Sequence, residues 1–206
     1  MFLRFYANFY FIFFLSIGWL VTGCSTVIHP HQDLNTYKNL KVRKQSTELS
    51  NFEAFGKVGF SDGKKGGSAT LEWIQQNQNF QVRLYGPLGN GAVQIYGQPG
   101  HVILTQSGKN AVAKNPEALV QAQLGLTIPV SGLQFWLRGM PVPGTLVKHL
   151  EMDAQQHIWE MQQQGWLISY QVYQFKNGMA FPLKLTLKNG PIRLKFIFQR
   201  WKVLPS

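Results

Sequence analysis

Apolar and polar residues alternate with a period of two along most of the chain after residue 52. Residues 80–85 show this clearly, because Phe80, Val82 and Leu84 are separated by single polar residues. Such alternation is typical of a strand with one buried face. It predicts nine or more strands, at residues 55–60, 68–75, 80–85, 92–96, 101–106, 157–162, 166–175, 181–188 and 192–201.

Tight turns join these strands. Asn-Gly pairs at 177–178 and 189–190 are strong short-range hairpin signals, so neighbouring strands are expected to be antiparallel. The turn at residues 86–91 contains one unusual residue, since Leu88 is apolar where a hairpin normally carries glycine, proline or asparagine. Leu88 either packs across its own hairpin or has a role outside the fold.

The strand pattern is interrupted by two predicted helices. Asn115 can cap a helix that has Pro116 at its first position and ends at Gly125. A second short helix begins at Ser131 and stops at Gly139, and it is apolar nearly all round, as buried helices are. A further helix with a basic face is expected within residues 33–49.

These elements restrict the fold class to mainly β with internal helices. Nine or more short antiparallel strands must either form a sandwich or curl. Only the two adjacent helices between residues 115 and 139 are available to cover a face. A curled sheet with the helices packed into its concave side satisfies both facts, and a flat sheet with helices on one face is the alternative.

The N-terminus has the pattern of a bacterial secretion signal. Arg4 precedes an uncharged apolar run at residues 9–21, which is followed by Val-Thr-Gly and Cys24, the only cysteine. This ending resembles a lipobox, so residues 1–23 are predicted to be removed and Cys24 to be lipidated. Counted from Phe5, the run approaches transmembrane length, and an uncleaved anchor or a chance cysteine are the alternatives.

The predicted processing defines the domains and the location. Residues 24–33 form a lipidated tether, and residues 34–206 form a single domain. By resemblance to bacterial lipoproteins, Ser25 after the cysteine indicates the outer membrane, with the chain on its periplasmic face. Two acyl chains suffice for stable anchoring without a membrane span.

The formal charge of +11 falls to +10 when Arg4 is removed. Basic strands with interleaved aromatic residues also occur in nucleic-acid-binding proteins, but a lipidated periplasmic chain does not meet nucleic acid. The basic strand face is therefore expected to meet anionic lipid or an acidic partner, or else to be simply solvated.

Catalytic and metal-binding patterns are not found in the sequence. The five histidines lack metal-ligand spacing, the nine acidic residues form no close pair, and no GxSxG motif occurs. We therefore predict a protein that is not an enzyme and uses no metal or other cofactor. An envelope hydrolase whose residues are brought together by folding, and a passive structural lipoprotein, remain as alternatives.

Several motifs together resemble the outer-membrane lipoprotein receptor family LolB. They are the lipobox ending at Cys24, Pro87-Leu88-Gly89, Gln98-Pro99-Gly100, and an Ile-Pro to Met-Pro segment at residues 128–141 that contains Leu133 and Trp-Leu-Arg-Gly. The resemblance covers most of the mature chain and is looser in the C-terminal strands. It implies an incomplete antiparallel β-barrel whose helices plug an apolar cavity.

The resemblance also implies a function. A LolA-like periplasmic carrier would hand acylated lipoproteins to this chain. The chain would act as a monomer and would insert the lipoproteins into the outer membrane. Pro87, Leu88 and Gly89 would form a membrane-insertion loop. Candidates for the acyl cavity are Leu71, Trp73, Val82, Leu84, Leu133, Trp136, Leu137, Phe196 and Phe198, and for each of these plain core packing is the competing interpretation.

Physical chemistry agrees with a need for such a cavity. Three acyl chains hold about 40 methylenes, and exposing them to water costs on the order of 30 kcal/mol at roughly 0.8 kcal/mol each. A lipoprotein therefore needs shelter while it crosses the periplasm.

Overall fold

The computed structural model describes residues 50–86 and 91–205. The predicted signal peptide, Cys24, the tether, the helix expected within residues 33–49, and Pro87, Leu88 and Gly89 lie outside the described residues. These features remain predictions.

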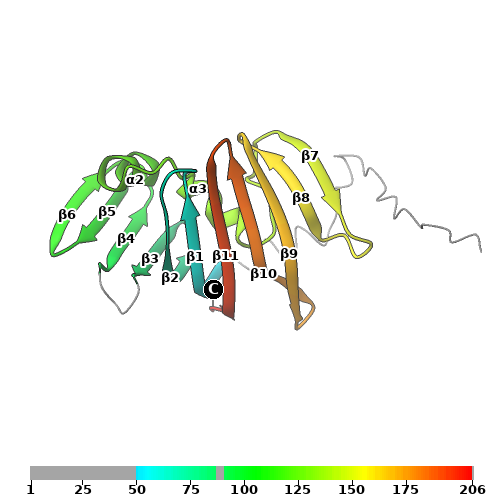
Figure 1. The fold of residues 1–206 in the computed structure, drawn as a ribbon. Coiled ribbons are helices and arrows are strands. Elements are labelled where there is room, and N and C mark those ends of the chain that lie inside the picture. Colours follow the sequence, from blue (N-terminus) through cyan, green and yellow to red (C-terminus); the bar gives the residue numbers. More distant parts are fainter. Residues whose placement is uncertain (1–49, 87–90, 206) are drawn as a thin grey trace, which may run out of the picture.

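Eleven antiparallel strands form one sheet (Figure 1). In chain order they are β1 (Asn51–Ser61), β2 (Gly66–Gln76), β3 (Asn79–Tyr85), β4 (Val93–Gln98), β5 (His101–Gln106), β6 (Lys109–Ala113), β7 (Val147–Met152), β8 (Ile158–Gln163), β9 (Trp166–Lys176), β10 (Met179–Asn189) and β11 (Ile192–Val203). Two helices, α2 (Pro116–Leu124) and α3 (Val130–Trp136), connect β6 to β7.

The order of strands in the sheet is β6-β5-β4-β3-β2-β1-β11-β10-β9-β8-β7. From β1 in the centre, the chain therefore moves outward to one edge at β6, crosses as α2 and α3 to the opposite edge at β7, and returns to the centre. There β11 pairs with β1 over most of the length of both strands. The edges β6 and β7 do not pair with each other, so the curled sheet is open. The prediction of a curled antiparallel sheet with internal helices is confirmed.

The sequence pattern missed the two edge strands. In β6, Lys109, Asn110 and Val112 are exposed, so apolar alternation is absent. In β7, only Leu150 and Met152 are buried, and the strand follows a proline-rich segment. An edge strand has unpaired backbone groups that can pair with another chain, and such strands are commonly short and carry charged or polar side chains, which weakens the apolar alternation.

The predicted helix starts are confirmed to within one residue. The Asn115 side chain accepts a hydrogen bond from the Ala118 backbone N–H at 2.8 Å, and α2 ends at Gly125 in the left-handed conformation. The second helix begins at Val130, one residue before the expected Ser131.

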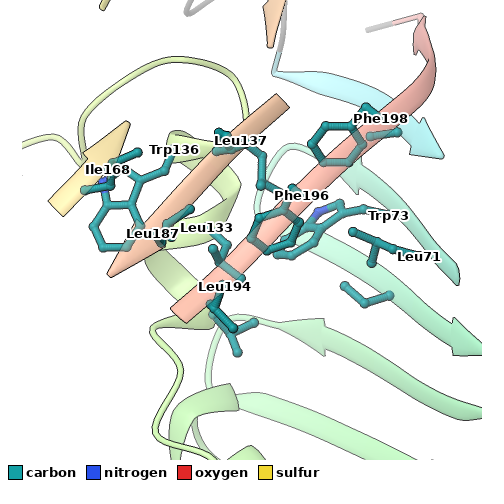
Figure 2. Packing of buried hydrophobic residues seen from close by; sticks show 14 of the residues in the cluster. Leu71, Trp73, Leu133, Trp136, Leu137, Ile168, Leu187, Leu194, Phe196 and Phe198 are labelled. Atoms are coloured by element: carbon teal, nitrogen blue, oxygen red, sulfur yellow. The ribbon is translucent and has the colours of Figure 1, made fainter. Parts of the chain in front are cut away.

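The core lies on the concave face of the sheet. Figure 2 shows side chains from distant strands meeting there, with Leu71 and Trp73 of β2 beside Phe196 and Phe198 of β11. A β-bulge in the β1–β11 pair lies next to Gly56, where an added Cβ would collide with the backbone of Ile197. Bulges bend a strand and increase its twist, which favours a curled sheet over a flat one.

Candidate functional site

An apolar cavity of about 260 Å³ lies between the concave face of the sheet and the segment that contains α2 and α3. It is partly open, and its lining is almost entirely apolar. The lining residues are Val58, Phe60, Gly67, Ser68, Ala69, Leu71, Trp73, Val82, Leu84, Ile95, Val120, Leu124, Leu126, Ile128, Val130, Leu133, Leu194 and Phe196.

Two parts of the chain make the walls. Strand residues two apart share a face, so β1, β2, β3, β4 and β11 contribute alternate side chains to one wall. The other wall comes from Val120 and Leu124 of α2, from Val130 and Leu133 of α3, and from the segment between the helices. The helices direct these apolar side chains toward the sheet. Burial of these side chains holds the helices in place, and the same side chains line the cavity.

Hydrogen bonds fix α3 against the second half of the sheet. The Trp136 indole donates to the Oε1 atom of Gln163 at 2.8 Å. The Tyr170 hydroxyl donates to the Trp136 backbone oxygen at 2.8 Å. The Gln163 side chain also bonds the backbone N–H and C=O groups of Val142 at 2.8 and 2.9 Å. The α3 wall of the cavity is therefore a fixed element.

Among the described residues, fewer hydrogen bonds join the α2 side of the cover to the sheet. The Glu117 carboxylate accepts a hydrogen bond from the Ser131 backbone N–H at 2.7 Å, which ties α2 to the start of α3. Among the described elements, α2 packs mainly against β5, β6 and α3. The segment 125–129 between the helices has no regular structure, and Leu126 and Ile128 in it line the cavity.

The structure places the nine candidate cavity residues in two groups. Six line the cavity: Leu71, Trp73, Val82, Leu84, Leu133 and Phe196. The other three, Trp136, Leu137 and Phe198, are buried in the core and do not line it. In Figure 2, Trp136 lies near Ile168 and Leu187, because its hydrogen bonds hold it against the β8–β10 side. Contact of any of the nine with an acyl chain stays a prediction.

Sequence reasoning missed much of the lining. Val58, Phe60 and Ala69 share the face of residues that were identified, so the period of two could have found them. Leu126 and Ile128 lie in an irregular segment, where no periodicity indicates which side chains face inward.

A second cavity of about 400 Å³ adjoins the first, and Trp73 and Val130 line both. Its lining is mixed, with polar Gln78, Lys114 and Gln134 beside apolar residues. The Trp73 indole donates to the Gln75 side chain at 2.9 Å, and Gln75 is itself buried. Trp73 therefore stands at the boundary between an apolar and a partly polar space.

One charged side chain is buried close to the helices. The Arg138 guanidinium lies over the rings of Phe52 and Phe135, at 5.9 and 5.2 Å from their centres, and its Nε donates to the Gln134 backbone oxygen at 2.6 Å. Burial lowers the pKa of Arg138 to about 10. The side chain remains charged at neutral pH, and the ring faces and the carbonyl partly replace its hydration.

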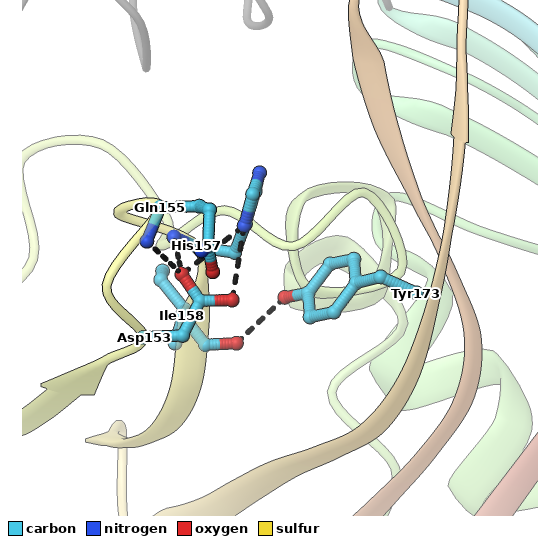
Figure 3. A network of polar contacts seen from close by, with 5 residues as sticks. All are labelled: Asp153, Gln155, His157, Ile158 and Tyr173. Carbon is cyan, nitrogen blue, oxygen red and sulfur yellow. Dashed lines mark hydrogen bonds and ion pairs between the residues drawn. The ribbon is translucent and has the colours of Figure 1, made fainter.

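The Asp153 and His157 side chains contact each other, and their contacts are those of a turn (Figure 3). The Asp153 carboxylate accepts from the backbone N–H groups of Gln155 and His157, both at 2.9 Å, and lies 3.0 Å from the His157 Nδ1 atom. The Tyr173 hydroxyl donates to the Ile158 backbone oxygen at 2.7 Å. The pair therefore closes the β7–β8 connection.

No group of three or more His, Cys, Asp or Glu side chains that could hold a metal ion occurs in residues 50–86 and 91–205. In the same ranges, no helix is long and apolar enough to cross a membrane.

Solved structures with a similar fold include a DUF1329 family protein from Desulfovibrio piger, with a TM-score of 0.55 at 8% identity over 82% of this chain and 92% of that one. A LolA superfamily protein from Nitrosomonas europaea has a TM-score of 0.52 at 9% identity, over 81% of this chain and 93% of that one. At these identities the likeness concerns the fold alone.

Relatives in sequence are more informative. The outer-membrane lipoprotein LolB of Ectopseudomonas mendocina is 37% identical over 78% of both chains. The LolB of Stutzerimonas stutzeri is 34% identical over 89% of this chain and 90% of that one, and the LolB of Cellvibrio japonicus is 35% identical over 88% and 90%. The family profile "Outer membrane lipoprotein LolB" matches residues 50–201, and the chain therefore belongs to the LolB family.

Proposed function

We propose that this chain is an outer-membrane lipoprotein that accepts acylated lipoproteins from a LolA-like periplasmic carrier and inserts them into the outer membrane. The observation that carries the proposal is the partly open, apolar cavity under α2 and α3. A filled core would bury the same side chains without leaving this volume. Membership of the LolB family supports the location and the class of cargo.

The cavity volume sets a condition on how cargo binds. About 40 methylenes, each needing the ~10–15 Å³ of free cavity volume that a buried water needs, take on the order of 400–600 Å³. The cavity of about 260 Å³ is smaller than that and accommodates about half of them. Acceptance of a whole lipoprotein therefore requires the cover to move. We assign that movement to α2 and segment 125–129, because α3 is fixed by Trp136, Gln163 and Tyr170.

Final release can proceed downhill in free energy. Noncovalent affinities saturate near about −20 kcal/mol. Returning three acyl chains to a bilayer recovers on the order of 30 kcal/mol. A protein cavity therefore holds the cargo less strongly than the membrane does, and no nucleotide is needed for this step.

The anchor and the insertion loop complete the proposal. Lipidated Cys24 would hold the domain to the membrane through residues 24–49, which span at most about 90 Å when fully extended. Pro87, Leu88 and Gly89 join β3 to β4, and Leu84 near the end of β3 lines the cavity. An apolar side chain so close in sequence to the cavity wall is suited to contact the bilayer as acyl chains leave.

Cargo binding tests the proposal directly. The mature chain, residues 24–206 with Cys24→Ser, is expressed with an acylated lipoprotein and purified. We expect the lipoprotein to co-purify, and Leu84→Gln to reduce its yield by placing an amide in the cavity wall. Leu167→Gln is the matched control, since Leu167 is also half-buried but is absent from the cavity lining.

Two outcomes would contradict the proposal. Absence of co-purifying lipoprotein, or equal yields from the Leu84 and Leu167 variants, would remove the role of the cavity. Depletion of the chain in cells separates receptor function from a passive structural one. Receptor function requires other outer-membrane lipoproteins to accumulate on their carrier, whereas a structural lipoprotein leaves their sorting normal.

A further inference from the structure

The convex face of the central strands carries a cluster of five cations. Strands β1, β11 and β10 lie side by side there (Figure 1). Their register aligns Lys57 with Ile197 and Lys184 in one row, Gly59 with Lys195 and Thr186 in the next, and Ser61 with Arg193 and Lys188 in the third. We call Lys57, Lys184, Lys188, Arg193 and Lys195 the basic face.

The basic face is small. Neighbouring strands are about 4.8 Å apart, and successive residues on one face are about 7 Å apart, so the five positions fall within roughly 10 Å by 13 Å. Their side chains point away from the core, because their neighbours in sequence, Val58, Leu185, Leu187, Leu194 and Phe196, are directed to the concave side. The concave cavity and the basic face thus share strands β1 and β11.

This arrangement is unfavourable for the fold itself. Arg193 and Lys188 are directly opposite each other in the β10–β11 pair, and like charges in such positions are destabilising. None of the five cations forms an ion pair with another residue in the part of the chain that the structure describes. The acids of β1 and β2 have other partners, since Glu53 pairs with Arg200 at 3.2 Å and Glu72 pairs with Arg83 at 3.0 Å.

We propose that the basic face binds the headgroups of anionic phospholipids and so holds the domain against the membrane surface. The partner must be anionic, because the face has five positive charges and no described counter-charge. A membrane is favoured over an acidic protein since the chain belongs to a family of outer membrane lipoproteins. Ile197, 43% exposed between Lys57 and Lys184, adds an apolar contact of the kind found in interfacial segments.

Binding through the basic face also determines how the domain is oriented on the membrane. On β1 and β11 the basic face and the cavity are on opposite sides of the sheet, so binding through the basic face leaves the cavity side directed away from the headgroups. A carrier in the periplasm can then reach the cavity while the domain stays at the membrane. Attraction between exposed charges is screened over about 10 Å at 0.1 M salt, so the contact should be reversible and dependent on ionic strength.

Vesicle binding tests this proposal. The mature chain with Cys24→Ser is mixed with vesicles of equal parts phosphatidylglycerol and phosphatidylcholine, or of phosphatidylcholine alone, and bound protein is separated by flotation. We expect binding to the anionic vesicles only, and a steady decrease with added salt. The triple variant Lys57→Gln, Lys184→Gln, Lys195→Gln should bind on the order of 100-fold more weakly, at about fivefold for each lysine.

The control variant removes the same number of charges elsewhere. It carries Lys109→Gln, Lys148→Gln and Lys176→Gln, which replace exposed lysines on β6, β7 and β9. We expect it to bind anionic vesicles nearly as well as the parent chain. All six positions are exposed or half-exposed, so circular dichroism should show that both variants are folded.

Three results would overturn the proposal: equal losses in both triple variants, no binding of the parent chain to anionic vesicles, or equal binding to neutral ones. A basic-face variant that keeps vesicle binding but loses binding to the purified carrier would assign the face to an acidic protein instead. Cargo co-purification is a separate readout, since none of the five cations lines the cavity. Failure here therefore leaves the proposed receptor function standing.

Discussion

The buried amide of Gln163 is predicted to be one of the most sensitive polar positions of the fold. Its side chain is 0% exposed and forms four hydrogen bonds. Oε1 accepts from the Trp136 indole and the Val142 backbone N–H, and Nε2 donates to the backbone oxygens of Val142 and Thr145 at 2.9 and 3.1 Å. One side chain thus joins α3, the proline-rich segment after it, and β8.

Gln163→Leu keeps a similar volume but removes all four hydrogen bonds. A buried polar group left without a partner costs about 1–3 kcal/mol. The full cost applies to the Trp136 indole N–H because Trp136 is fully buried. Val142 and Thr145 are half-buried, so their backbone groups can regain some water contacts. We therefore expect a loss of about 3–5 kcal/mol in the free energy of unfolding.

Urea unfolding of the mature chain, followed by tryptophan fluorescence and circular dichroism, measures this loss. Gln171→Leu is the matched control, because Gln171 is exposed and its amide donates only to the nearby Ser169 backbone oxygen. That variant should stay within about 0.5 kcal/mol of the parent chain. A destabilisation of less than about 1 kcal/mol for Gln163→Leu would refute the claim that this amide fixes α3.

Three further predictions concern single substitutions elsewhere in the chain. Leu88→Glu should leave folding and cargo acceptance intact but block delivery to the membrane, measured as lipoprotein transfer to liposomes. Leu146→Glu, at an exposed leucine elsewhere, should deliver normally, and normal delivery by both variants would refute a special role for Leu88. Hydrogen bonds from backbone N–H groups, that of Lys65 first, lower the pKa of Asp62 below its usual 3.8. The carboxylate therefore stabilises the fold above that pH and loses the effect as pH falls, so Asp62→Asn should make the thermal midpoint less sensitive to acid; an unchanged acid dependence would contradict this. Lys188→Gln should not lower the thermal midpoint, since it removes a like charge opposite an arginine, and a clear decrease would show that the charge is compensated.

Local features of the sequence predicted the elements well where they carried strong signals. The helix start at Asn115 was identified from a cap that the structure contains. The alternating strands were found because a period of two reports which face is buried, and that property depends on neighbouring residues alone. The edge strands β6 and β7 were missed because they bury few side chains and so lack the pattern.

The candidate cavity was only partly accessible to the same reasoning. Leu71, Trp73 and Phe196, which the sequence indicated as candidates for the cavity wall, line the cavity. Trp136 and Leu137 have the same apolar character in the same predicted helix as Leu133, yet they are packed in the core. Whether each residue lines the cavity or packs in the core depends on the residues that it contacts across the fold. Gln163, the partner of Trp136, is 27 residues away.

The sequence by itself determined the class of fold, the inward face of most strands and the family to which the chain is similar, because these follow from short-range periodicity and from motifs. Only the tertiary structure decided that β1 pairs with β11, that five cations form one face, and that a cavity of about 260 Å³ remains beneath the helices. A cavity is the volume that facing elements fail to fill, and it depends on side chains that are distant in the chain. Apolar composition alone cannot distinguish such a space from a filled core.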